Sequence, residues 1–319
     1  MSRKDEAKLL SQLLIVAAAV CLFSLVFFIV WTAGTAETRR YDDLVPLPTE
    51  EFRAQGIAEF PETAVDEFTS DAVRLKADYS LTGLGLVKID VLYPEDESVY
   101  ISLLPAEDAR DRAPGESVYD RKLKPHGSSG VFSLTHGSGE YELCVWIQKE
   151  SIDELRSNYQ RVYQRFFTAS FAEEEPYSYS NANSVFEEDS LAAAYAHALI
   201  ADLGNDMDRA AAIIAFVHER IEYNEDTSDT EENIMSADEI LEAEEGFCYH
   251  FAGLSSAMLK SVGIPAKEVR GLNKKLEGTH AWCEVLVDGY WLTADPTLHR
   301  AFPLDPAGYE AYEHTNPHN

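Results

Sequence analysis

The sequence predicts an α+β protein with an N-terminal transmembrane helix, a β-sandwich domain, and a last domain in which helices pack on a small antiparallel sheet. An uncharged apolar run near the start predicts the first part, and period-two alternation of apolar residues predicts the second. Helical periodicity followed by short strand-like runs predicts the third. We expect a cytoplasmic tip and anchor over 1–32, an acidic linker over 33–70, the sandwich over 71–176 and the last domain over 177–319.

The apolar run contains no charged side chain from Leu9 to Ala36. A helix of about 20 apolar residues spans a bilayer, so residues 9–31 are the expected membrane anchor. Arg3, Lys4 and Lys8 precede the run, and positive flanks favour the cytoplasmic side. The expected topology is therefore single-pass in the cell membrane, with a cytoplasmic N-terminus and extracytoplasmic domains.

A cleaved signal peptide is the alternative, with Gly34–Ala36 as its small-residue cleavage site. The run is longer than the apolar region of about 7–15 residues that signal peptides carry, which favours a retained anchor. Under either interpretation the rest of the chain lies outside the cytoplasm, where disulfides are permitted. Only Cys144, Cys248 and Cys283 remain there, so at least one thiol stays free unless it pairs between chains.

The formal net charge of −30 argues against nucleic acid as a partner, because phosphate binding needs clustered Lys and Arg. The acidic stretch over 33–70 shows weak periodicity and is interrupted by Pro46, Pro48 and Pro61, as expected of a linker.

The β-sandwich prediction rests on seven short runs separated by glycine- and proline-containing turns. Such spacing is typical of a sandwich, and none of the runs carries a catalytic pattern. The expected strands are Val73–Tyr79, Val87–Val91, Val99–Leu103, Val118–Lys124, Gly130–Thr135, Tyr141–Ile147 and Gln160–Phe171.

The last domain begins with alanine-rich helical patterns and ends in strands. A capping box at Ser236 to Glu239 starts a short helix, and Asp288-Gly289 is a strong hairpin turn. The expected helices are Ser190–Leu203, Asp208–Tyr223, Ser236–Ala243 and Tyr249–Ser261, and the expected strands are Ala266–Arg270, His280–Val287 and Tyr290–Ala294.

Cys248 stands at the first turn of the Tyr249–Ser261 helix, two residues after Gly246. A helix N-terminus stabilises a thiolate, and the backbone N–H of Cys248 is one candidate oxyanion donor. A thiol nucleophile also needs a base and a group that orients the base. His280 and Asp295 meet that need, since the Asp288-Gly289 turn brings them together on adjacent strands. An inert core cysteine is the simpler alternative for Cys248.

Three segments resemble the transglutaminase-like superfamily, which has a papain-like fold. Among its members, the chain resembles the bacterial or archaeal membrane-anchored type. They are "IIAFVHERIEYNED", "GFCYHFAGLSSAMLKSVGIPAKEVRG" and "THAWCEVLVDGYWLTADPT", within Ser190–Leu298. The resemblance implies that Cys248, His280 and Asp295 are catalytic. It also implies acyl transfer from an amide to an amine or water through a thioester, without a cofactor.

Other residues near this set have less definite roles. The second oxyanion donor is not evident, and Tyr223 is its candidate. Trp282 falls on the face of His280, either as a wall of the site or as a core aromatic, whereas Cys283 falls on the other face and is expected to be structural. The spacing of Cys248 and His250 fits neither common zinc pattern, so no metal site is predicted.

The expected function is therefore that of a membrane-anchored extracytoplasmic cysteine enzyme acting on peptide or protein amides. Its partners are a peptide or protein substrate and, through residues 9–31, the membrane. Whether an amine or water resolves the thioester, giving transamidation or peptide hydrolysis, stays open. The alternative is a catalytically silent transglutaminase-like protein that serves as a surface binding or scaffold module.

Overall fold

The computed structural model describes residues 41, 44–93, 98–106, 121–122, 128–153, 156–224, 235–276 and 278–311. The chain divides into two units, Met1–Leu44 and Val45–Asn319. The expected anchor over residues 9–31 lies outside the described residues. No helix in the described part of the chain combines the length and the apolar composition needed to cross a membrane.

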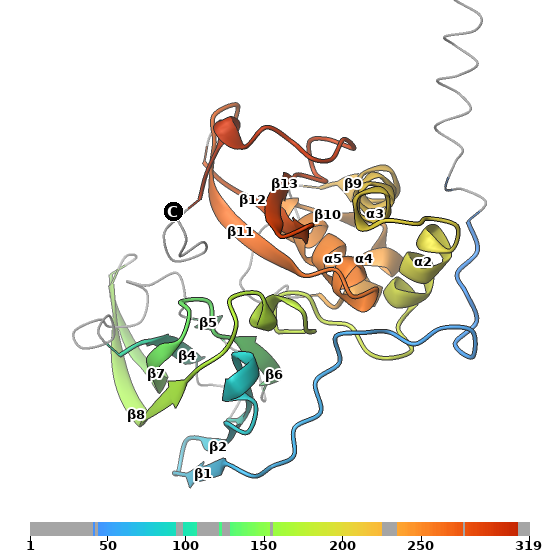
Figure 1. Cartoon of the computed structure of the whole chain (residues 1–319). Helices are drawn as coiled ribbons and strands as arrows, with labels where there is room; N and C mark the ends of the chain where they lie inside the picture. The colour runs from blue at the N-terminus through green and yellow to red at the C-terminus, as the bar shows by residue number, and fades with distance from the viewer. Residues whose placement is uncertain are drawn as a thin grey trace, which may run out of the picture. The chain divides into compact units, whose positions relative to one another are not determined.

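Eight strands between residues 65 and 169 form two four-stranded antiparallel sheets (Figure 1). The first sheet has the order β1 (Val65–Thr69), β2 (Arg74–Asp78), β3 (Leu86–Leu92), β6 (Ser128–Ser133). The second has the order β5 (Arg121–Lys122), β4 (Ser98–Pro105), β7 (Gly139–Asp153), β8 (Arg156–Ala169). A short 3-10 helix, η1 (Thr82–Leu84), precedes β3.

Both sheets contribute to one hydrophobic cluster. Val87 and Ile89 of β3 lie in it together with Leu143 and Val145 of β7, as period-two alternation requires. The seven expected strands overlap β2 to β8. Strand β1 differs from the expectation, because residues 65–69 belonged to the predicted linker. They form a strand because they pair along β2 and because Phe68 packs against the cluster.

Residues 45–61, which we call the N-terminal strap, also differ from a free linker. Phe52 is buried against Ala193 and Ala194. The Leu47 N–H donates to the Ala194 carbonyl at 3.3 Å, and the Gln55 N–H donates to the Ser261 carbonyl at 2.8 Å. The strap is therefore packed on the helices that follow in sequence.

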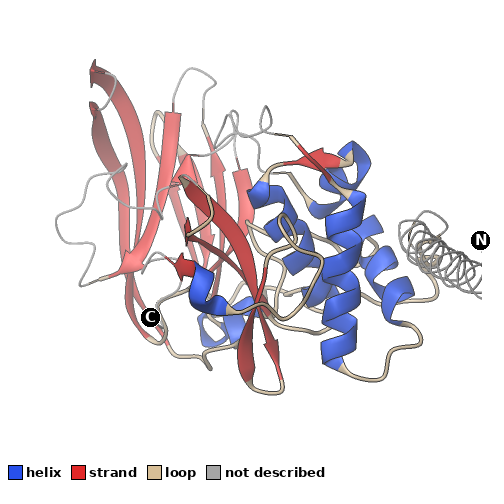
Figure 2. Ribbon diagram, turned by 90° about the horizontal axis from the view of Figure 1, so that it is seen from above, coloured by secondary structure: helices blue, strands red, loops and turns tan. Residues whose placement is uncertain are grey.

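The described residues after the sheets include four α-helices. They lie next to the strands that follow them (Figure 2). The first three of them begin at polar caps: Ser190 accepts from the Ala193 N–H, Asn205 accepts from the Asp208 N–H, and Ser236 forms the expected capping box. After the 3-10 helix η2 (Glu175–Tyr177) come α2 (Leu191–Ile200), α3 (Asp206–Arg220), α4 (Ala237–Ala243) and α5 (Cys248–Ser261).

Helix α5 is the centre of this region, because it contacts α2, α3, α4, β11 (Ala266–Asn273) and β12 (Thr279–Val287). Every residue of α5 except Tyr249 is buried. Burial lowers the pKa of Lys260, and Glu268 opposes this. The Lys260 Nζ lies 3.3 Å from Glu268 Oε1 and donates to Ser184 Oγ at 2.6 Å. The buried charge is thus paired and hydrogen-bonded, as a buried lysine requires.

The last sheet has the antiparallel order β13-β12-β11-β14. The Asp288-Gly289 turn joining β12 to β13 is confirmed: both residues have positive φ (51° and 82°), and Val287 pairs with Tyr290. The strands are β11 (Ala266–Asn273), β12 (Thr279–Val287), β13 (Tyr290–Ala294) and β14 (Tyr309–Ala311), with a 3-10 helix η4 (Pro306–Gly308) before β14. Two short strands, β9 (Glu222–Tyr223) and β10 (Glu245–Gly246), pair in parallel.

Candidate active site

Cys248 is the first residue of α5, and its side chain is nearly buried, with 8% of the residue exposed. The residue before it, Phe247, has extended backbone angles, and its N–H donates to His250 Nδ1 at 3.3 Å. Gly246 is needed here because an added Cβ would lie 2.7 Å from the His250 Cβ. His250 therefore holds the start of the helix in place.

His280 lies on β12 and is 3% exposed. Its Nε2 is 2.8 Å from Asp295 Oδ2, and its imidazole is also hydrogen-bonded to the Cys248 thiol. Since Asp295 takes Nε2, Nδ1 is the ring nitrogen left for the sulfur. The structure thus brings together Cys248, His280 and Asp295 from a helix start, a strand and a strand end.

The electrostatics favour a charged imidazole. Burial lowers the pKa of His280, but hydrogen bonds to Asp295 and Cys248, together with the charges of both groups, outweigh burial and raise the pKa to about 9. An imidazolium between a carboxylate and a sulfur is the arrangement that stabilises a thiolate.

Asp295 follows β13 and is fully buried. Ala294 pairs with Cys283, which puts the carboxylate at the level of the His280 end of β12. Its Oδ2 accepts from His280 and from the Tyr309 hydroxyl at 2.9 Å, and its Oδ1 accepts from the Leu298 N–H at 3.2 Å. Three donors on one buried carboxylate fix its orientation.

The loop after Asp295 is attached to α3 by two side chains that sequence reasoning did not single out. His218 Nδ1 lies 2.8 Å from the Pro296 carbonyl, which can only accept, so this nitrogen carries a proton. Arg300 pairs with Glu219 at 3.3 Å. The segment "IIAFVHERIEYNED" contains His218 and Glu219, but nothing in it indicates their distant partners.

Residues 193–296 match the profile of the transglutaminase-like superfamily. The chain carries a transglutaminase-like domain. The match includes Cys248, His280 and Asp295, and no curated protein sequence matches the chain.

Solved structures with a likeness to the chain are distant. A candidate cysteine protease from Cytophaga hutchinsonii is 14% identical over 77% of this chain and 82% of its own, with a TM-score of 0.38. The periplasmic domain of TgpA from Pseudomonas aeruginosa is 17% identical over 80% and 85%, with a TM-score of 0.31. Red sea bream transglutaminase is 14% identical over 70% and 50%, with a TM-score of 0.26. Likenesses at this level assign no activity.

Within the transglutaminase-like domain, Trp282 packs behind the histidine. It is 1% exposed, and its ring is stacked near His280 with centroids 6.3 Å apart and planes at 25°. Its other neighbour is the Tyr309 ring at 5.1 Å. Trp282 is thus a buried aromatic that supports His280 from its own face of β12.

Tyr223 precedes Cys248 in the sequence and is 49% exposed. It pairs with Gly246 in the β9–β10 ladder, and its ring centroid is 6.4 Å from that of Phe251. This places Tyr223 beside the strand that leads into Cys248.

The remaining cysteines have other surroundings. Cys283 is fully buried, donates to the Ala252 carbonyl at 3.2 Å and accepts from Ser256 Oγ at 3.6 Å. Cys144 is buried in β7. Among the described residues, no group of three or more His, Cys, Asp or Glu side chains is arranged to bind a metal ion.

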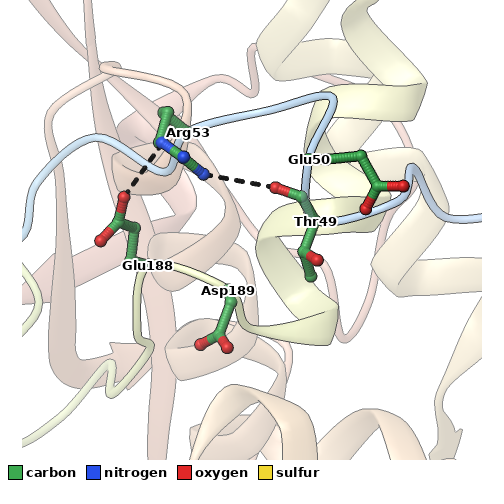
Figure 3. Close-up of a pocket in the computed structure, with 5 residues that line it drawn as sticks. All are labelled: Thr49, Glu50, Arg53, Glu188 and Asp189. Atoms are coloured by element: carbon green, nitrogen blue, oxygen red, sulfur yellow. Dashed lines mark hydrogen bonds and ion pairs between the residues drawn. The ribbon is translucent and has the colours of Figure 1, made fainter.

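One open hollow lies away from this set, where the N-terminal strap meets the start of α2 (Figure 3). Its lining residues are Thr49, Glu50, Arg53, Glu188 and Asp189. Arg53 pairs with Glu188 at 3.2 Å, but both side chains are largely exposed, so the pair contributes little. Neither Cys248 nor its partners line the hollow.

Proposed function

We propose that this chain is a cysteine acyltransferase or cysteine peptidase that acts on peptide or protein amides through a thioester on Cys248. The observation that supports this most is the pair of hydrogen bonds made by the His280 imidazole. One joins its Nε2 to Asp295, and the other joins the ring to the Cys248 thiol. A nucleophile, a base and an orienting group within hydrogen-bond reach are the signature of covalent catalysis.

The proposed reaction has two halves. The Cys248 thiolate attacks the amide carbonyl carbon, a C–S bond forms, and the C–N bond breaks as the His280 imidazolium gives its proton to the leaving amine. An amine or water then attacks the thioester and loses its proton to His280, and the C–S bond breaks to regenerate the thiolate. These steps consume no redox equivalents and call for no cofactor.

The oxyanion formed in each half needs hydrogen-bond donors. The backbone N–H of Cys248, in the first turn of α5, is the proposed first donor because the N–H groups of that turn lack partners within the helix. Tyr223 is the candidate second donor, supported by its pairing beside Gly246. Trp282 supports the base from behind and is not proposed to touch substrate.

We further propose that residues 9–31 anchor the protein in the cell membrane, with the described domains outside the cytoplasm. The charge asymmetry of Arg3, Lys4 and Lys8 around the apolar run supports this orientation. Protease treatment of intact cells should then remove the described domains, and protection until lysis would contradict the orientation.

The deciding experiment is alkylation of the purified full-length chain with iodoacetamide at neutral pH, followed by mass spectrometry of each cysteine peptide. Cys248 should react first. Cys144 and Cys283 are internal controls, because burial raises the pKa of Cys144 to about 12 and also raises that of Cys283. Equal or slower labelling of Cys248 in the folded protein would contradict the proposal and leave the silent binding module.

A further inference from the structure

The C-terminal segment of the described chain crosses from one edge of the last sheet to the other. The Leu304 N–H donates to the Thr293 carbonyl at 2.9 Å next to β13, and β14 then pairs with β11 (red in Figure 1). The fit is close, because a Cβ on Gly271 would collide with the Glu310 carbonyl. Leu304 and β14 lie beyond residue 296, where the family match ends, and their partners Thr293 and β11 lie within the match.

Strand β14 places Tyr309 next to the carboxylate of Asp295. The Tyr309 hydroxyl and His280 Nε2 both bind Asp295 Oδ2, at 2.9 and 2.8 Å. Two donors therefore share one oxygen, and each reduces the negative charge that the other experiences.

Asn273 sets the direction of this hydrogen bond. It is buried and pairs with Tyr309 across the β11–β14 ladder. Its Oδ1 accepts from the Lys275 N–H at 2.9 Å, which leaves its amide N–H groups for the side-chain hydrogen bond to Tyr309. Since the phenol oxygen accepts from Asn273, its own proton points to Asp295.

We propose that Tyr309 is a positioning residue that orients Asp295 and limits how strongly Asp295 holds the proton of His280, with Asn273 fixing the direction of the Tyr309 hydroxyl. The inference rests on the proposed function. It adds to the nucleophile, base and orienting group a fourth member from outside the matched domain.

The neighbouring charges make the expected direction definite. The groups that act on His280 are Asp295 after β13 and Cys248 from α5, and Tyr309 from β14 acts through Asp295. Burial, followed by the charge of Asp295, raises the pKa of Tyr309, so the phenol stays a neutral donor throughout the working range. Removing it concentrates the carboxylate charge on His280, which then holds its proton to higher pH.

The first test compares Tyr309→Phe with wild type in the full-length chain. The alkylation rate of Cys248 by iodoacetamide, followed by mass spectrometry from pH 6 to pH 10.5, has an inflection where the imidazolium loses its proton. In Tyr309→Phe this inflection should move up by about 0.3 to 1 pH unit. Turnover of the amide substrate should fall about 3- to 10-fold in kcat with unchanged KM.

Tyr290→Phe is the matched control, because Tyr290 is 72% exposed beside the Asp288-Gly289 turn. It removes the same hydroxyl group from the same sheet and should leave both the inflection and kcat at wild-type values.

A second variant tests the direction of the hydrogen bond. Asn273→Asp replaces a donor with an acceptor, which draws the Tyr309 proton away from Asp295. The inflection should again move up, and part of this shift should vanish when Asn273→Asp is made in the Tyr309→Phe background. A pure charge effect of the new carboxylate would persist in that background. Asn273→Asp also decides the question if circular dichroism shows that Tyr309→Phe does not fold.

The outcomes separate this inference from the proposed function. An unchanged inflection in both Tyr309→Phe and Asn273→Asp, with or without a lower kcat, reduces Tyr309 to a structural contact and overturns the inference. Absence of rapid Cys248 alkylation in the wild-type chain overturns the proposed function instead.

Discussion

Two cysteines lie in or against helix α5, and the groups around their thiols differ. Cys248 begins the helix, where its thiol is hydrogen-bonded to His280. Cys283 packs against the middle of the helix, where its thiol donates to the Ala252 carbonyl. Both side chains are buried, so burial alone does not distinguish a nucleophile from a structural thiol.

The two environments differ in the groups that meet the sulfur. Burial raises the pKa of Cys283. The Ala252 carbonyl accepts a hydrogen bond from the thiol, and such a contact favours the protonated form. At the helix start the sulfur meets an imidazole that can be positively charged, together with the N–H groups of the first turn. The start of α5 thus favours the thiolate form of Cys248, whereas the middle of α5 favours the neutral thiol of Cys283.

The largest expected effect is the contrast between two alanine variants. Cys248→Ala should abolish turnover, because no other group can form the thioester. Cys283→Ala should keep turnover within about twofold and lower the free energy of unfolding by about 1–2 kcal/mol, through the lost sulfur contacts and a small cavity. The measurements are amide turnover on a peptide library, with and without a labelled amine, and urea unfolding.

These two variants control for each other, since both remove one sulfur atom beside α5. Full turnover in Cys248→Ala would refute the enzymatic interpretation. A loss of turnover in a folded Cys283→Ala protein would mean that the middle of α5 belongs to the site.

Asp295→Asn should have the next largest effect. It keeps the shape of the carboxylate but offers His280 an amide, which orients the imidazole less well. A cysteine is partly ionised before substrate arrives and depends less on its base than serine does, so kcat should fall by about 10- to 10³-fold. Steady-state kinetics checks this, with circular dichroism to show that the variant folds. Wild-type kcat would exclude Asp295 from the mechanism.

The site was predictable where local pattern determines geometry. The Asp288-Gly289 turn fixed the register that brings Asp295 to His280, and the Gly246-to-Cys248 stretch placed the thiol at a helix start. Tyr309 was not predictable, because a three-residue strand has no periodicity and its partner β11 lies far back in the sequence. The N-terminal strap was missed for the same reason: Phe52 is one apolar residue in an acidic stretch, and the alanines that bury it come much later.

The pH dependence of turnover should separate the two chemistries of Cys248. Because the pKa of His280 is raised to about 9, the imidazolium that protonates the leaving amine is lost above that pH. Amide turnover should therefore fall about tenfold for each pH unit above 9. Alkylation by iodoacetamide expels iodide, which needs no proton, so its rate should not fall over the same range. Parallel decline of both rates would point to unfolding instead.

The smallest expected effect is on stability, and its sign follows from the same shift. The pKa of His280 is about 9 in the folded chain and about 6.5 in an unfolded one, so the folded state binds the proton more tightly. Its contribution to the free energy of unfolding is fully present below pH 6.5 and is lost as the pH rises through 9.

The difference in free energy of unfolding between wild type and His280→Ala should therefore be largest near pH 6 and should shrink toward pH 9.5. Packing lost on truncation adds an offset that does not depend on pH, so only the change with pH reports the charge. Urea unfolding of the full-length chain at closely spaced pH values measures it. A difference that grows with pH would mean that the imidazole is held neutral, and the contrast between the two ends of α5 would then rest on position alone.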